Sequence, residues 1–262
     1  MSTSPRVVVH RDKQLLAEAA AARLVTRLVD AQSSRGSATA VLTGGSVGTG
    51  VLAALAASPA RDAVDWSRVD LWWGDERFLP SGDPERNETQ AREALLHRLP
   101  LDPQRVHPMP ASDGPDGDDV DAAAARYADE LAEAARREGA REGVPTIDVL
   151  MLGVGPDAHV ASLFPEMAGV HETERTVIGV HGSPKPPPLR ISLTLPVICS
   201  AQEVWLVVGG EDKAAAVGLA LRGAGAVQAP AAAVSGRRAT LWLLDRAAAA
   251  QAPPALVRLA SP

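Results

Sequence analysis

Short apolar runs rich in β-branched residues alternate with alanine-rich stretches along nearly the whole chain. Several of these runs are apolar at successive positions, as strands buried on both faces are, and Ile147–Leu152 is so from Val149 onward. Strands separated by helices form βαβ units, whose strands lie parallel in one sheet. The sequence therefore predicts an α/β fold built around a largely parallel sheet.

The expected strands share an apolar, β-branched composition: Arg6–His10, Ala38–Leu42, Val69–Trp73, Ile147–Leu152, Thr176–Val180, Ile191–Leu195, Val204–Val208 and Thr240–Leu244. The expected helices lie between them: Lys13–Ala31, Thr49–Ala57, Asn87–Leu99, Asp119–Glu138 and Asp212–Leu221. Acidic, glycine-rich Asp113–Asp121 and proline-rich Gly182–Pro188 are expected to be surface loops. Neither is typical of a long interdomain linker, so we expect residues 1–262 to form a single domain, with room for a small extra lobe.

Composition and charge exclude several classes of protein. The net charge is −6 and no basic stripe is present, so nucleic acid is not an expected partner. No stretch approaches the ~20 apolar residues of a membrane span. The N-terminus lacks the features of a signal peptide, so we expect a cytoplasmic protein that does not contact membranes. The lone Cys199 excludes a disulfide within the chain and is expected to be a small buried side chain.

One strand end carries the most informative motif. The apolar run Ile147–Leu152 ends in a turn of glycine and proline that also holds Asp157 and His159. Ligands bind at the carboxyl ends of the strands in open α/β sheets. Histidine transfers protons near neutral pH, and a carboxylate two residues away could orient the ring. A lone histidine is more often a satisfied polar residue at a helix start, so this motif needs support from elsewhere in the chain.

Two more strand ends carry glycine followed by polar groups. Gly44, Gly45 and Ser46 lie between an expected strand and an expected helix, where free backbone N–H groups attract phosphate. Gly209-Gly210 follows another strand and precedes Lys213, one of only three lysines in the chain. A plain βα turn would use the same glycines. The first motif matches neither the Walker motif nor G-x-G-x-x-G, so no nucleotide cofactor is expected.

Charged residues follow the strand Val69–Trp73. Asp75, Glu76 and Arg77 cannot all continue a buried strand, so we expect them in the crevice at the edge of the sheet. The planar fork of Arg77 suits phosphate or carboxylate, because it donates two hydrogen bonds at once. The alternative is a surface ion pair, which is worth only ~0–1 kcal/mol. Arg190 is a weaker candidate for the same ligand.

Together, these strand ends predict a concave site for a small phosphorylated molecule, with one histidine as the base. Asp75 and His159 lack a further ligand at metal-site spacing, so no metal is expected. No G-x-S-x-G elbow is present, and an acyl-enzyme is therefore not expected.

Residues 153–165 resemble a signature of the 6-phosphogluconolactonase family. Gly-Val-Gly-Pro-Asp-Ala-His-Val-Ala-Ser-Leu-Phe-Pro is similar to the family's Gly-x-Gly-x-Asp-Gly-His-x-Ala-Ser-Leu-Phe-Pro. Gly74–Arg77 resembles its second signature, and Asn87 matches a later asparagine. Thr43–Ser46 and Gly209–Lys213 resemble two further segments, so the motifs extend in order from residue 40 to 213.

The resemblance implies a three-layer α/β/α fold with a Rossmann-like sheet, shared with glucosamine-6-phosphate deaminases and ribose-5-phosphate isomerases. It implies hydrolysis of 6-phosphoglucono-δ-lactone in the oxidative pentose phosphate pathway, without a cofactor, by a monomer or weak homodimer. His159 would take a proton from the attacking water, oriented by Asp75 or, as the less favoured choice, by Asp157. The phosphorylated lactone would be bound by Gly44, Gly45, Ser46, Arg77, Asn87, Arg190 and Lys213.

Two features separate the possible activities. Deaminases continue after the histidine with a segment like Ile-Ala-Phe-Asn-Glu-Pro, whereas this chain has Val160–Pro165, and Arg77 stands where deaminases favour tyrosine. Lactonase is therefore favoured, with a glucosamine-6-phosphate deaminase or sugar-phosphate isomerase as the alternative.

Ala158 stands where the family usually has glycine, and it would strain the turn if that position needs a positive φ. A non-catalytic sugar-phosphate-binding module is the third reading.

Overall fold

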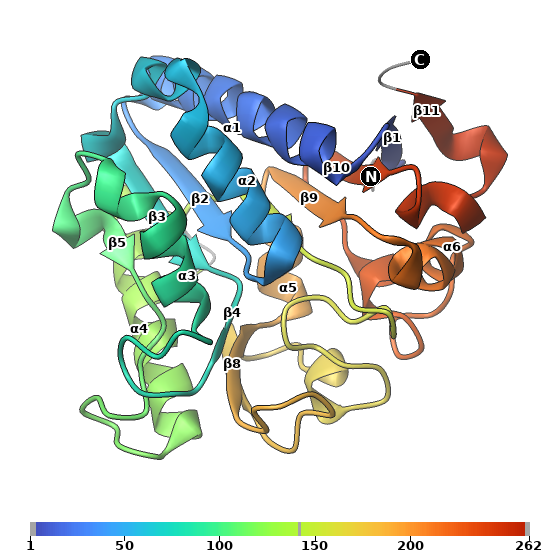
Figure 1. Ribbon diagram of the computed structural model, residues 1–262. Helices are drawn as coiled ribbons and strands as arrows, with labels where there is room; N and C mark the ends of the chain where they lie inside the picture. The colour runs from blue at the N-terminus through green and yellow to red at the C-terminus, as the bar shows by residue number, and fades with distance from the viewer. Residues whose placement is uncertain (1–3, 141–142, 260–262) are drawn as a thin grey trace.

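The computed structural model describes residues 4–140 and 143–259, and over these ranges the strands form two sheets (Figure 1). The strands are β1 (Arg6–His10), β2 (Ala38–Leu42), β3 (Val69–Trp73), β4 (Asp75–Arg77), β5 (Val106–His107), β6 (Val149–Leu152), β7 (Val177–Val180), β8 (Arg190–Leu193), β9 (Glu203–Val208), β10 (Ala239–Asp245) and β11 (Val257–Leu259). The main sheet has the order β11-β1-β10-β9-β6-β2-β3-β5, and its neighbouring strands are parallel. The second sheet, β4-β8-β7, is antiparallel.

Helices cover both faces of the main sheet, which confirms the expected three-layer α/β/α fold. The helices are α1 (Lys13–Arg35), α2 (Gly45–Ala57), α3 (Asn87–Ala94), α4 (Val120–Glu138), α5 (Leu195–Ser200) and α6 (Ala214–Leu221). α1 packs against α2, and α2 against α3, so these three share one face (Figure 1). Right-handed crossovers put α4, α5 and α6 on the opposite face, where α4 also packs against β7. No helix in the described ranges combines the length and apolar character needed to cross a membrane.

The order of the strands places a crevice between β2 and β6. The chain leaves β2 through α2 toward β3, but leaves β6 in the opposite direction toward β9. The two connections therefore separate at the carboxyl ends of these neighbouring strands, which is where ligands bind in open α/β sheets. A hydrogen bond from the Gly153 backbone N–H to the Thr43 hydroxyl, 3.2 Å long, joins the two strand ends.

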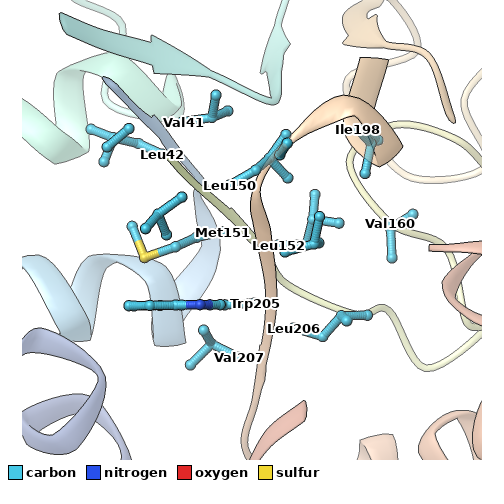
Figure 2. Close-up of a cluster of buried hydrophobic side chains, with 14 of the residues drawn as sticks. Val41, Leu42, Leu150, Met151, Leu152, Val160, Ile198, Trp205, Leu206 and Val207 are labelled. Atoms are coloured by element: carbon cyan, nitrogen blue, oxygen red, sulfur yellow. The ribbon is translucent and has the colours of Figure 1, made fainter. Parts of the chain in front are cut away.

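The core lies on both faces of the central strands. Figure 2 shows Met151 and Trp205 on one side of the sheet, and Leu152 and Leu206 with Ile198 on the other. β6 and β9 pair so that Met151 lies opposite Trp205, and all of these side chains are at most 1% exposed. Because successive side chains of a strand point to opposite faces, an uninterrupted apolar run is what such a doubly covered strand requires.

Three differences from the sequence predictions lie in the segments that follow β2 and β3. α2 begins at Gly45 rather than Thr49, so the glycine loop itself forms the first turn of the helix. Asp75–Arg77 continues the chain as a new strand, β4, because it pairs with β8 outside the main sheet. The expected helix Asn87–Leu99 ends as α3 at Ala94, since Leu95 leaves the helical conformation with φ −145° and ψ −51°.

A buried ion pair ties the first helix to the central strands. The guanidinium of Arg35, in the last turn of α1, bonds both carboxylate oxygens of Asp148. The Asp148 side chain is 6% exposed and also accepts the backbone N–H of Thr39 at 2.8 Å. A buried carboxylate needs such partners, because removing a charge from water is costly.

Candidate active site

A cavity of about 320 Å³ opens at the crevice between the ends of β2 and β6. Its wall combines glycines from the strand ends with charged side chains: Thr43, Gly44, Gly45, Ser46, Val47, Gly48, Asp75, Arg77, Asn87, Gly153, Val154, Gly155, His159, Ala161, Lys185, Arg190, Val207, Val208, Gly209 and Lys213. The structure thus brings together every residue that the sequence assigned to the site except Asp157, which lies directly behind His159. This volume suits a molecule the size of a phosphorylated sugar.

His159 and Asp157 form a close pair at one end of the cavity. The Nδ1 atom of His159 lies 2.5 Å from the Asp157 carboxylate, and the Nζ atom of Lys185 lies 3.3 Å from each of them. Partial burial raises the pKa of Asp157, but the hydrogen bond and charge of His159 and the charge of Lys185 outweigh it, so the pKa lies well below its usual value. The carboxylate therefore stays ionised at neutral pH and can hold the ring through Nδ1.

The turn before His159 is built around a close approach. A Cβ atom placed on Gly155 would lie 2.0 Å from both Cε1 and Nδ1 of the imidazole, so only glycine leaves room for the ring. Ala158 has φ 66° and Ala161 has φ 49°, a region that L-residues seldom adopt. Position 158 thus does require the positive φ that favours glycine, and the alanine adopts it with its side chain fully buried. Such strained residues persist where the surroundings over-determine them, often around a reacting group.

Asp75 does not pair with His159, contrary to the preference drawn from the sequence. Its carboxylate accepts a hydrogen bond of 2.7 Å from the Ser162 hydroxyl and a longer one of 3.4 Å from the Asn87 amide. Asp75 is 8% exposed and lines the cavity beside the imidazole rather than behind it. The structure therefore makes Asp157 the carboxylate that orients the ring. The contact between Asp75 and Ser162 spans 87 residues, so local sequence could not reveal it.

Glu76 lies outside the cavity, because alternate side chains of β4 face opposite sides. Its fully buried carboxylate accepts the backbone N–H groups of Arg77, Asn87 and Glu88 at 2.7–2.9 Å. It thereby caps the start of α3, where Arg86 supplies no side-chain cap. Burial raises the pKa of Glu76 to about 7, against the lowering effect of Arg86 and the three N–H groups. This carboxylate supports the site by fixing Asn87.

The opposite wall is suited to an anion. No side chain caps α2 at Gly44, so the first N–H groups of the helix remain available to a ligand. Arg77 donates to the Asn87 side-chain oxygen at 2.9 Å and lines the cavity. Gly44 packs so closely on Asn87 that any side chain there would overlap it. Lys213 adds a second positive charge, partly neutralised by Asp212 at 2.8 Å.

Lys185 is the residue of the site that the sequence analysis missed. It lies in the proline-rich loop Gly182–Pro188, which was expected to be a surface loop. A signal was available, since the scarcity of lysine that drew attention to Lys213 applies equally to Lys185. The loop reaches the cavity because Arg190, 6% exposed, donates to backbone carbonyls within it.

The charged groups of the cavity do not form a metal centre. Over residues 4–140 and 143–259, no three histidine, cysteine, aspartate or glutamate side chains gather in a way that could hold an ion. What the arrangement offers is a proton acceptor and a set of anion-binding groups in the wall of one cavity.

Comparison with known proteins identifies relatives along the entire chain. The family described as glucosamine-6-phosphate isomerases/6-phosphogluconolactonase matches residues 11–242. The 6-phosphogluconolactonase of Streptomyces coelicolor is 70% identical over 261 residues, which cover 100% of both chains. The 6-phosphogluconolactonase of Mycobacterium tuberculosis is 48% identical over 250 residues, covering 95% of this chain and 99% of that protein.

Solved structures agree with these relatives. The 6-phosphogluconolactonase of Trypanosoma brucei superposes with a TM-score of 0.79 at 26% identity, covering 95% of this chain and 99% of that one. A monomeric glucosamine-6-phosphate deaminase superposes with a TM-score of 0.74 at 19% identity, over 94% and 99% of the two chains. The second similarity is one of fold alone.

Proposed function

Because this chain belongs to the glucosamine-6-phosphate isomerase/6-phosphogluconolactonase family, we propose that it hydrolyses 6-phospho-D-glucono-1,5-lactone to 6-phospho-D-gluconate, a step of the oxidative pentose phosphate pathway. The observation that carries this function is the 70% identity to a 6-phosphogluconolactonase over the full length of both chains. The pairing of His159 with Asp157 at one end of an anion-binding cavity supplies the chemistry that such a reaction needs.

His159 acts as the general base in this proposal. Its Nδ1 atom donates to Asp157, which leaves Nε2 as the proton acceptor. Nε2 takes a proton from water while the water oxygen forms a bond to C1 of the lactone. The tetrahedral intermediate then breaks the bond between C1 and the ring oxygen, and the imidazolium returns the proton to that oxygen. One positioned base contributes ~10²–10⁴-fold to such a step.

Asp157 and Lys185 support the base. The Asp157 carboxylate holds the ring orientation and stabilises the imidazolium that forms, as a carboxylate does in other hydrolytic sites. The Lys185 ammonium, 3.3 Å from that carboxylate, fixes it in turn. Its positive charge lines the cavity, where it can stabilise the negative charge that develops on the carbonyl oxygen.

The phosphate of the substrate binds at the other wall. The first N–H groups of α2, at Gly45 and Ser46, and the side chains of Arg77 and Lys213 provide its contacts. Asn87 holds Arg77 in place through its side-chain oxygen. Binding a group remote from C1 positions the lactone against the attacking water, and this is how binding energy lowers the barrier.

We also propose that residues 1–262 act as a single domain, in a monomer or weak homodimer. The strands of the main sheet come from both ends of the described chain, since β1 pairs with β10 and β11. Sedimentation analysis should give a species of about one chain mass at micromolar concentration, and a stable higher oligomer would contradict this.

The experiment that tests the function is lactone hydrolysis measured above the spontaneous background. The His159→Ala variant should lose ~10²–10⁴-fold in kcat, while the inhibition constant of the product 6-phosphogluconate stays close to that of the unchanged chain. The Arg77→Ala variant should mainly raise KM and the product inhibition constant. Full activity of the His159 variant would refute the base. Ammonia release from glucosamine 6-phosphate, without lactone hydrolysis, would instead identify a deaminase.

A further inference from the structure

Arg190 contacts the protein in a way that differs from the other cations of the cavity. Its Nε atom donates to the Pro187 carbonyl at 3.3 Å, and its Nη2 atom donates to the carbonyls of Pro186 and Lys185 at 2.9 and 3.2 Å. Three consecutive backbone carbonyls are thus held by one guanidinium. Arg190 is 6% exposed, and burial lowers the pKa of this group. The Nε and Nη2 donors are engaged by the protein itself, so a phosphate could reach only Nη1 without displacing one of these bonds.

The carbonyls held by Arg190 belong to the segment that carries Lys185 to the reacting pair. The Lys185 carbonyl accepts from Arg190 and also from the Ser183 hydroxyl at 2.8 Å, so the backbone of this residue is fixed from two sides. Its Nζ atom lies 3.3 Å from both His159 and Asp157. Without Arg190, the loop would keep only its internal bonds through Ser183, and the bonds that join its carbonyls to β8 would be lost.

A second contact leads from Arg190 to the histidine through an aromatic ring. The Cζ atom of Arg190 lies 5.8 Å from the centre of the Phe164 ring, within the range of a cation–π contact. The Phe164 ring is 4.5 Å from the His159 ring, centre to centre, and tilted by 38°. Phe164 is 1% exposed, so it is wedged between the guanidinium and the imidazole.

From these contacts we infer that Arg190 is a positioning residue of the reaction rather than a ligand of the substrate phosphate. It fixes Lys185 against the pair of His159 and Asp157 through the loop, and it supports the imidazole through Phe164. Lysine cannot replace it fully, because an ammonium lacks the planar fork that reaches several carbonyls at once. This inference rests on the proposed lactone hydrolysis, in which His159 is the base.

The test is a double-mutant cycle between Arg190→Met and Lys185→Met, with the lactone as substrate. Arg190→Met should lower kcat on the order of 10²-fold, as a small misplacement of reacting groups does, while the inhibition constant of 6-phosphogluconate changes by less than about threefold. The kcat of the double variant should be no more than about threefold below that of the less active single variant. Both changes remove the same contact, that of the Lys185 ammonium with His159 and Asp157. Arg190→Lys should retain an intermediate kcat.

Arg77→Met is the matched control, since it removes a guanidinium from the same cavity. It should raise the product inhibition constant, and its effect should multiply with that of Lys185→Met. Circular dichroism establishes which variants fold. If the Arg190→Met variant does not fold, the same double-mutant cycle is run with Arg190→Lys.

The inference is overturned if Arg190→Met raises the product inhibition constant tenfold or more, or if its effect on kcat multiplies with that of Lys185→Met. A readout independent of turnover is the NMR chemical shift of the His159 ring protons. These chemical shifts should change in the same direction in the Arg190→Met and Lys185→Met variants. An unchanged ring in the Arg190 variant would also contradict the inference. Failure of the proposed function itself is distinguished by an unmodified protein that binds 6-phosphogluconate but does not hydrolyse the lactone.

Discussion

Replacing Gly155 with alanine should disable the enzyme without unfolding it. The added Cβ would lie 2.0 Å from Cε1 and Nδ1 of His159 and 2.4 Å from an oxygen of Asp157. Ordinary carbon contacts begin near about 3.5 Å, so the imidazole must move by more than about 1 Å. Gly155 is not among the residues with positive φ, and alanine therefore causes no backbone strain there. The damage should be confined to the ring.

The size of the effect follows from that displacement. A misplacement of about 1 Å costs on the order of 10²-fold in rate, and loss of the bond between Asp157 and the ring adds to it. We therefore expect kcat to fall between 10²- and 10³-fold, on the order of the contribution of the base itself. The inhibition constant of 6-phosphogluconate should change little, because the nearest atoms that the new Cβ would meet belong to His159 and Asp157 and not to the anion-binding groups.

The assay is lactone hydrolysis above background, with thermal unfolding as the measure of stability. Gly50→Ala is the matched control: its Cβ would meet only the Ala17 side chain at 3.8 Å, and alanine is favoured over glycine within a helix by about 1 kcal/mol. That variant should keep its activity and unfold at an equal or higher temperature. A Gly155→Ala variant with more than a third of the original kcat would refute the geometry given for His159.

Three further predictions concern stability. Ala158→Gly should change the free energy of unfolding by less than about 1 kcal/mol. Relief of the strain at the positive φ, worth ~1–2 kcal/mol, is offset by the greater entropy of the unfolded chain and by the loss of a buried methyl group. A larger change measured by urea unfolding would contradict this. Arg35→Ala should cost about 2 kcal/mol, because the buried Asp148 carboxylate keeps the Thr39 N–H but loses its partly exposed cation, and a loss below about 1 kcal/mol would show that water replaces the arginine. Because the pKa of Glu76 is raised to about 7, the folded state keeps the Glu76 proton to a higher pH than the unfolded chain does. The free energy of unfolding should therefore fall by up to about 3 kcal/mol as the pH rises from 4.5 to 7. Glu76→Gln should flatten that decline, and an unchanged pH profile of stability would contradict the assignment.

Much of the fold follows from local patterns in the chain. Strands such as Val69–Trp73 are bounded as the sequence predicts, because a run of mostly apolar side chains indicates a strand covered on both faces. The glycine loop after Ala38–Leu42 was placed correctly at a helix start. The end of the predicted helix at Leu99 was wrong, since Leu95 leaves the helical conformation and Leu96–Arg98 forms a separate 3-10 turn.

The motifs of the site were visible for the same reason. Polar residues and glycines that interrupt an apolar pattern at a strand end have to face the crevice, and so His159, Arg77 and Lys213 could be assigned to the cavity. The requirement for a positive φ at Ala158 was also predictable from the glycine that the family signature has at that position.

Amino-acid sequence alone therefore determined which segments form strands and helices, and which strand ends carry chemistry. Only the tertiary structure decided that Asp157, and not Asp75, holds the imidazole, that Lys185 joins them, and that Arg190 holds the loop in place. The physical reason is the range of the interactions. Periodicity in the chain reports how each segment is buried, whereas the order of strands and the path of a proline-rich loop depend on contacts between residues far apart in sequence.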